Sequence, residues 1–277
     1  MPPNEEAAAL GAVARDYRYD RGPDGEPFER TIAVETPVNI LFGGIPFAVM
    51  MTTPADLEDF AIGFALTEGI VESLNDIRGV AIERAEGGLK VNVTLAGERM
   101  SAHLARGRAI SGRTGCGLCG IDDLASLPAA RARIANAAPI EPAAVKAALQ
   151  ALDHRQPLNA ETRAVHGAAW CDRKGAIVAL REDVGRHNAL DKLIGALAVG
   201  GVAPAEGFFV ITSRCSFEMV AKAAIFGAST LVALSAPTSL AVERAEASGI
   251  TLIAIARADQ ATIFTPPDRP AAGELAA

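Results

Sequence analysis

The chain has 277 residues, of which 50% are hydrophobic and 21% charged, a composition that suits one or two globular domains with sizeable cores. Its formal net charge of −7 argues against a general electrostatic attraction to nucleic acid. The sequence contains no long apolar run that predicts a membrane span and no basic leader typical of a secretory signal. We therefore expect a cytoplasmic protein without membrane partners.

The first predicted domain, residues 28–112, is of the α+β type. Strands are indicated at residues 30–42 and 45–51, because Gly43 and Gly44 between them are a hairpin signal. A second hairpin is expected across Gly87-Gly88, where apolar and polar residues alternate on the following strand.

One helix is predicted in this domain, beginning at the segment Thr53-Pro54-Ala55-Asp56. Thr53 can cap the helix, Pro54 fits the first helical position, and Asp56 complements the positive helix end. Gly69 fits the position just after the last turn.

The second predicted domain, residues 121–266, alternates strands and helices. Strands are expected at 164–170, 176–181, 207–213, 229–235 and 250–256, and helices at 142–152, 188–198, 216–226 and 238–248. This alternation is typical of βαβ units and predicts an α/β domain with a largely parallel sheet. The ends of the chain, 1–27 and 267–277, are expected to be flexible.

A cysteine pair lies between the domains, in the glycine-rich loop 113–120. Cys116 and Cys119 have the spacing of zinc, redox and sulfur-carrying sites. Zinc needs two further ligands, but Cys171 and Cys215 stand alone and the histidines are scattered, so we expect no metal site. The glycines favour a mobile thiol over a rigid redox turn. Spacing alone does not choose among these chemistries or exclude an inert turn.

Five segments, in this order along the chain, resemble the motifs of the FdhD family, the formate dehydrogenase accessory sulfurtransferases. The segments are 53–60 (TPADLEDF), 113–120 (RTGCGLCG), 182–192 (EDVGRHNALDK), 212–220 (TSRCSFEMV) and 235–241 (SAPTSLA). Each segment is weak evidence alone, whereas the five in order are highly specific.

The resemblance implies a sulfur carrier that accepts sulfur from a cysteine desulfurase as a persulfide. The persulfide would form on Cys116, with Cys119 as the supporting thiol. The sulfur would pass to the molybdenum or tungsten bis(molybdopterin guanine dinucleotide) cofactor, a bound substrate that is then inserted into formate dehydrogenase. The resemblance further implies a homodimer and a C-terminal domain with a cytidine-deaminase-like fold.

The cofactor-binding residues are predicted from the resemblance and from turns that follow strands. The resemblance places one stretch near the C-terminus, at Ile255, Ala256, Arg257, Ala258, Asp259 and Gln260. Strand-end turns suit phosphate or a guanine base because they expose backbone N–H groups and positive helix ends. Their candidate residues are Asp183 as a guanine acceptor, Arg186, His187, Ser213, Arg214 and Ser216. Ordinary solvated, capped turns remain the alternative.

Two other functions are weighed against sulfur transfer. A zinc hydrolase of the deaminase type needs H-x-E and P-C-x-x-C, but Gly115 precedes Cys116 and no glutamate follows His103 at the required place. A non-catalytic chaperone that only binds the cofactor would not need the cysteines.

Overall fold

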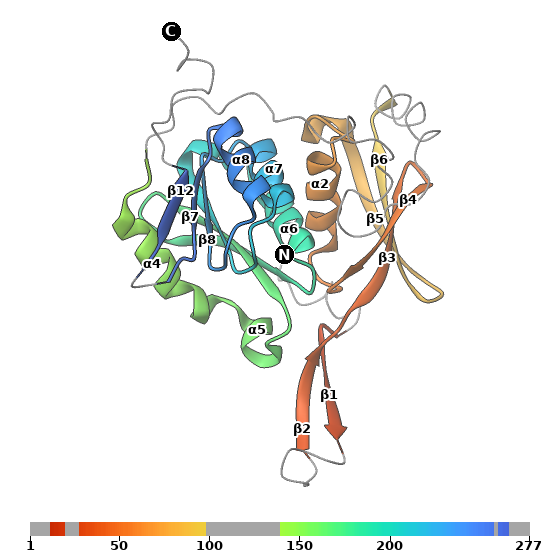
Figure 1. Cartoon of the computed structure of the whole chain (residues 1–277). Helices are drawn as coiled ribbons and strands as arrows, with labels where there is room; N and C mark the ends of the chain where they lie inside the picture. The colour runs from red at the N-terminus through yellow and green to blue at the C-terminus, as the bar shows by residue number, and fades with distance from the viewer. Residues whose placement is uncertain (1–11, 20–27, 98–138, 258–259, 266–277) are drawn as a thin grey trace.

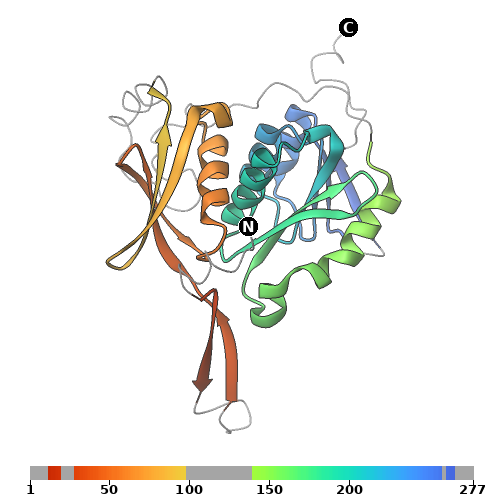
Figure 2. The same ribbon diagram turned by 180° about the vertical axis from the view of Figure 1, so that it is seen from behind.

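The computed structural model describes residues 12–19, 28–97, 139–257 and 260–265 and places two units side by side. Among these residues, the first unit is a four-stranded sheet packed against a helix, and the second is a six-stranded sheet with helices on both faces. Helix α2 (Leu57–Thr67) of the first unit and α6 (Arg186–Val199) of the second lie next to each other between the two sheets (Figures 1 and 2). Within the described ranges, no helix has the length and apolar character needed to cross a membrane.

The sheet of the first unit has the strand order β4-β3-β6-β5. Its strands are β3 (Thr36–Phe42), β4 (Ile45–Thr52), β5 (Ile77–Ala85) and β6 (Gly88–Leu95). β3 pairs with β4 and β5 pairs with β6 in antiparallel fashion, so both predicted hairpins are confirmed. Alternate strand side chains such as Ile40 and Val91 pack with Phe60 of α2 in one buried core.

The start of α2 differs from the prediction, and its end agrees with it. Asp56, not Thr53, is the residue before the helix, and its φ of 52° makes a sharp entry with no side-chain cap. Thr53 is buried and hydrogen-bonds to the second unit instead. Gly69, with φ of 67°, follows the helix as expected.

An additional two-stranded arm precedes the first sheet. The strand predicted over residues 30–42 is in fact two strands, because β2 (Phe28–Ala33) leaves the sheet and pairs with β1 (Ala14–Tyr19). Figure 1 shows the pair extending below the two units. β1 lies in the N-terminal segment that we expected to be flexible. Pairing with β2 satisfies backbone groups that the sequence alone left without a partner.

The second unit contains a six-stranded sheet of order β12-β11-β10-β9-β7-β8. Its strands are β7 (His166–Asp172), β8 (Ile177–Asp183), β9 (Gly207–Ile211), β10 (Thr230–Ala233), β11 (Thr251–Ala254) and β12 (Thr262–Thr265). One face packs on α6, α7 (Phe217–Phe226) and α8 (Ser239–Ser248), and the other on α4 (Pro142–Leu152). The predicted strands and helices of this unit are confirmed, whereas β12 and α5 (Pro157–Thr162) were missed.

The prediction of a largely parallel sheet is wrong for the sheet as a whole. β9, β10 and β11 are parallel and are joined through α7 and α8, so the βαβ units are confirmed. β7 and β8 form a hairpin, β7 runs antiparallel to β9, and β12 runs antiparallel to β11. The smaller first unit and mixed α/β second unit agree with the expected fold class, and the deaminase-like topology stays a prediction.

The two units contact each other closely at a crossing of α2 and α6. A Cβ atom added to Gly63 would lie less than 3.0 Å from the carbonyl oxygen of Asp191, and one added to Gly195 would lie equally close to the carbonyl oxygen of Asp59. Only glycine permits backbones to approach this far. The crossing therefore sets the distance between the two units.

Candidate functional site

Several predicted site residues meet at one edge of the six-stranded sheet. β8 and β9 end at this edge and β7 begins there, so His166 pairs with Asp183. The Thr212 N–H donates to the Gly167 carbonyl at 3.0 Å, and the Gly167 N–H donates to Thr212 Oγ1 at 2.9 Å. The turns after β8 and β9 therefore lie on the two sides of the start of β7, at one end of the sheet.

The segments that follow β9, β10 and β11 are also joined. The Cys215 N–H donates to the Ala236 carbonyl at 3.2 Å, and the Ile255 N–H donates to the Ser235 carbonyl at the same distance. Arg257 donates through Nη1 to the carbonyl oxygens of Leu234 and Ala256. Arg257 thus stabilises the backbone that follows β10 and β11.

The predicted C-terminal stretch is partly described. Ile255 and Arg257 are exposed, Ala256 is buried, and Gln260 makes a backbone turn with Arg257. Ala258 and Asp259 lie outside the described residues.

Ile255 has a strained backbone. Its φ is 52°, a region that β-branched residues rarely adopt, and its side chain remains 43% exposed. Strain of this kind occurs most often where a site requires a particular backbone shape. The C-terminal end of β11 therefore has a feature that local sequence preference alone would not produce.

The starts of α6 and α7 carry buried polar atoms without partners. Arg186 Nε, His187 Nε2 and Ser216 Oγ have no hydrogen-bond partner among the described residues. Unpaired buried groups in a folded protein usually indicate a bound water, ion or ligand. Arg186 Nε lies at the positive start of α6 and suits an anionic group, whereas His187 and Ser216 also interact with the carboxylate of Glu218.

Glu218 adds a carboxylate beside these donors. Its Oε2 atom lies 3.8 Å from His187 Nε2, the distance of an ion pair rather than a hydrogen bond. Burial alone would raise the pKa of Glu218, but the neighbouring His187 and Ser216 side chains outweigh it and lower the pKa to about 2. Glu218 therefore stays ionised at neutral pH beside His187.

The pKa of His166 is lowered by burial and, to a smaller extent, by the charge of Arg186.

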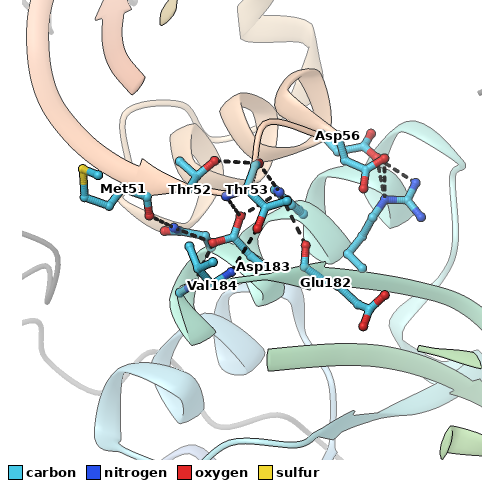
Figure 3. Close-up of polar contacts among 12 residues, drawn as sticks. Met51, Thr52, Thr53, Asp56, Glu182, Asp183 and Val184 are labelled. Carbon is cyan, nitrogen blue, oxygen red and sulfur yellow. Dashed lines mark hydrogen bonds and ion pairs between the residues drawn. The ribbon is translucent and has the colours of Figure 1, made fainter. Parts of the chain in front are cut away.

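Asp183, predicted as an acceptor for guanine, makes structural contacts with both of its carboxylate oxygens. It is fully buried, and Oδ1 accepts from the Gly185 N–H at 2.7 Å and from Asn188 Nδ2 at 3.0 Å. Its Oδ2 accepts from the Thr53 N–H at 3.0 Å and forms an ion pair with Lys192 Nζ at 2.7 Å (Figure 3). Four neighbours occupy both oxygens, so the described contacts of Asp183 are structural, and its role as an acceptor for guanine stays a prediction.

The partners of Asp183 connect the two units. Lys192, which has no exposed surface, donates to the Thr53 carbonyl at 2.9 Å, and Asn188 Nδ2 donates to the Met51 carbonyl at 2.8 Å. We did not predict these roles, because Thr53 looked like a helix cap. A lysine among apolar helical residues was the available signal for Lys192, since such a charge is buried only when paired.

Of the predicted phosphate ligands after β9, only one side chain is exposed. Ser213 is buried and its hydroxyl donates to the Arg214 carbonyl at 3.0 Å, which stabilises the turn. Arg214 is exposed and Ser216 is half-buried. The ligand-binding roles predicted for these residues stay predictions.

The model of the FdhD/NarQ family matches residues 33–271 of this chain. The chain belongs to the FdhD/NarQ family. A relative named sulfur carrier protein FdhD, from Xanthomonas euvesicatoria pathovar vesicatoria, is 44% identical over 96% of this chain and 95% of its own length. A relative of the same name from Bordetella bronchiseptica is 48% identical over 87% of each chain.

A solved structure shares the fold of this FdhD/NarQ protein. The crystal structure of a candidate formate dehydrogenase accessory protein from Desulfotalea psychrophila aligns with a TM-score of 0.67. The alignment covers 92% of this chain and 97% of the other at 24% sequence identity. The arrangement of both units therefore occurs in an experimentally solved protein.

The four cysteines of this FdhD/NarQ protein fall into two classes. Cys171 and Cys215 are 0% exposed, and burial raises the pKa of each thiol to about 12. At neutral pH both remain protonated, and a protonated thiol is a poor nucleophile. Cys116 and Cys119 lie outside the described residues. Among the described residues, no group of three or more His, Cys, Asp and Glu side chains could hold a metal.

Proposed function

We propose that this FdhD/NarQ protein is a sulfurtransferase that carries sulfur on Cys116, with Cys119 as the supporting thiol. The observation that carries the proposal is the inert state of Cys171 and Cys215, which leaves the loop pair as the candidate carriers. The name of the relatives, sulfur carrier protein, supports the same assignment.

The proposed sulfur donor is a cysteine desulfurase bearing a persulfide. The Cys116 thiolate attacks the terminal sulfur of that persulfide, and the bond between the two donor sulfurs breaks. Cys116 becomes the persulfide and the donor cysteine leaves as a thiolate.

The proposed acceptor is the bis(molybdopterin guanine dinucleotide) cofactor with molybdenum or tungsten, bound as a substrate before formate dehydrogenase receives it. The unpaired donors of Arg186, His187 and Ser216 support binding of its phosphates. The description of the solved neighbour as a formate dehydrogenase accessory protein supports this destination. A cytoplasmic homodimer with a deaminase-like second unit belongs to the same proposal.

Mass spectrometry after incubation with a desulfurase and cysteine tests the carrier step. We expect one added sulfur atom on the peptide that contains Cys116 and none on that peptide in Cys116→Ala. Cys215→Ala is the matched control and should load normally, because its thiol is buried. An unloaded wild-type loop, or full in-cell activity of Cys116→Ala, would contradict the proposal.

A cofactor-binding chaperone without sulfur chemistry is the second candidate. It is favoured by one observation: the unpaired donors at the sheet edge belong to α6 and to the residue that precedes α7, and none is a thiol. A Cys116→Ala, Cys119→Ala double variant separates the candidates. If it still matures formate dehydrogenase in cells, the chaperone is correct.

A further inference from the structure

The turn before α6 is held by a loop from the other half of the chain. The Val184 N–H donates to Thr53 Oγ1 at 3.2 Å, while the Thr53 N–H donates to Asp183 Oδ2 at 3.0 Å (Figure 3). Thr53 is 1% exposed, so water does not compete for these bonds. One residue of the first unit thus contacts two consecutive residues of the turn.

Lys192 and Asn188 hold the backbone of the same loop. Lys192 Nζ lies between the Asp183 carboxylate at 2.7 Å and the Thr53 carbonyl at 2.9 Å. Asn188 donates from one side-chain nitrogen to Asp183 and to the Met51 carbonyl. The loop around Thr53 and the turn around Asp183 therefore form one buried polar unit.

The turn leads directly to two of the unpaired donors. Val184 and Gly185 precede Arg186 and His187, whose Nε and Nε2 atoms are buried without a hydrogen-bond partner in the described chain, although His187 Nε2 also lies 3.8 Å from Glu218 Oε2. The turn has little room to rearrange, because a Cβ at Gly185 would lie 2.7 Å from Asn188 Nδ2. A displacement of Val184 would consequently shift the donors that follow it.

We propose that Thr53 is a positioning residue for the nucleotide part of the cofactor. Its hydroxyl holds Val184, and thereby the first unit sets the affinity of a site built by the second. The inference rests on the proposed function, which supplies the guanine dinucleotide as ligand. Thr53 would act through the position of Val184 and not by contact with the ligand, because its side chain is buried.

Calorimetric titration with guanosine diphosphate tests this role. Thr53→Val keeps the size and branching of the side chain but removes the acceptor for the Val184 N–H. We expect about tenfold weaker binding, the effect of losing one ordinary hydrogen bond. Thr53→Ser restores the hydroxyl, and its affinity should stay within about twofold of the wild type.

Thr67→Val is the matched control. The Thr67 hydroxyl donates to Asp191 Oδ1 at 2.7 Å and accepts from Lys222 Nζ at 2.8 Å, so it also joins α2 to the second unit. It lies at the opposite end of α2 from Thr53. We expect a lower melting temperature for Thr67→Val with unchanged affinity for guanosine diphosphate.

The outcomes separate this inference from the proposed function. If the wild type does not bind guanosine diphosphate, the cofactor-binding proposal fails and the role of Thr53 fails with it. If the wild type binds and Thr53→Val binds equally well, only the positioning role is wrong. Equal weakening by Thr53→Val and Thr67→Val would also overturn it, because loosening of the two units would explain both results.

Discussion

Two of the contacts between the units obey different physical limits. Gly63 of α2 and Gly195 of α6 allow a close backbone crossing that has no space for a methyl group. Before α2, Thr53 meets Asp183 through hydrogen bonds in a buried polar contact. The crossing is limited by volume and fixes how far apart the units lie. The polar contact depends on hydrogen-bond partners for its buried groups and fixes the turn that leads into the candidate site.

A third contact between the units is an ion-pair cluster around Lys222. Lys222 Nζ is 2.9 Å from Asp191 Oδ1 and also contacts Glu68 and Thr67, all within the packed helices. Burial alone would lower the pKa of Lys222, but the carboxylates of Asp191 and Glu68 raise it. The ammonium group is thus retained inside the contact by the charges around it.

The largest loss of stability is expected from breaking the polar contact with Lys192→Met. Asp183 would remain buried without its cation, and removal of one partner of a buried pair costs about 3–5 kcal/mol. Denaturant unfolding measures this loss. Lys146→Met, at an exposed position on α4, is the control and should change stability little. Equal stability of the two variants would show that Lys192 is not needed as a counter-charge.

The crossing is tested by Gly63→Ala. The added methyl group would overlap the Asp191 carbonyl, and overpacking of this kind costs about 1–3 kcal/mol or more. Gly79→Ala places the same group where nothing lies within 4 Å and serves as the control. Thermal unfolding should show a clear loss for the first variant only. A tolerated alanine at both positions would mean that the helices can move apart.

The pH dependence of stability tests the sheet edge rather than the contact between units. The pKa of Glu218 is lowered from 4.5 to about 2, so the unfolded state binds the proton more strongly. The ionised Glu218 carboxylate contributes its full stabilisation above pH 4.5, and this stabilisation disappears as the pH falls toward about 2. Glu218→Gln should therefore have a shallower decline in unfolding free energy across this window. An unchanged slope would contradict the interaction with His187.

The smallest effect is expected at Ile255, where the strain is local. Ile255→Gly should be more stable than Ile255→Ala by about 1 kcal/mol, because only alanine keeps a Cβ at positive φ. Both variants remove the exposed side chain beyond Cβ, so their difference reports the cost of a Cβ at positive φ. Melting temperatures of the pair provide the measurement. A more stable alanine variant would mean that the residue is not held in the left-handed region.

The sequence predicted most local structure because its signals are local. Gly43-Gly44 marks a hairpin, and the alternation of strands and helices after residue 164 marks the βαβ units. These patterns depend on residues a few positions apart, so they can be recognised from the sequence alone. The strands β1 and β12 were missed since each depends on a partner strand for pairing.

Residue roles were predicted less well, and Thr53 and Asp183 show the reason. Each has an ordinary local explanation, a helix cap and a polar turn, yet they hydrogen-bond each other across 130 positions of sequence. Burial and pairing of Asp183 are not visible in the local sequence, and neither is the burial of the donor atoms of Arg186, His187 and Ser216.

The sequence by itself determined the family, the order of most elements and the four thiols among which a sulfur carrier must be sought. The tertiary structure decided that two of those thiols are inert, because only packing can bury them and raise the pKa of each to about 12. It also decided that Asp183 pairs with Lys192 and Thr53, since a buried charge requires partners and the fold determines which ones lie within reach.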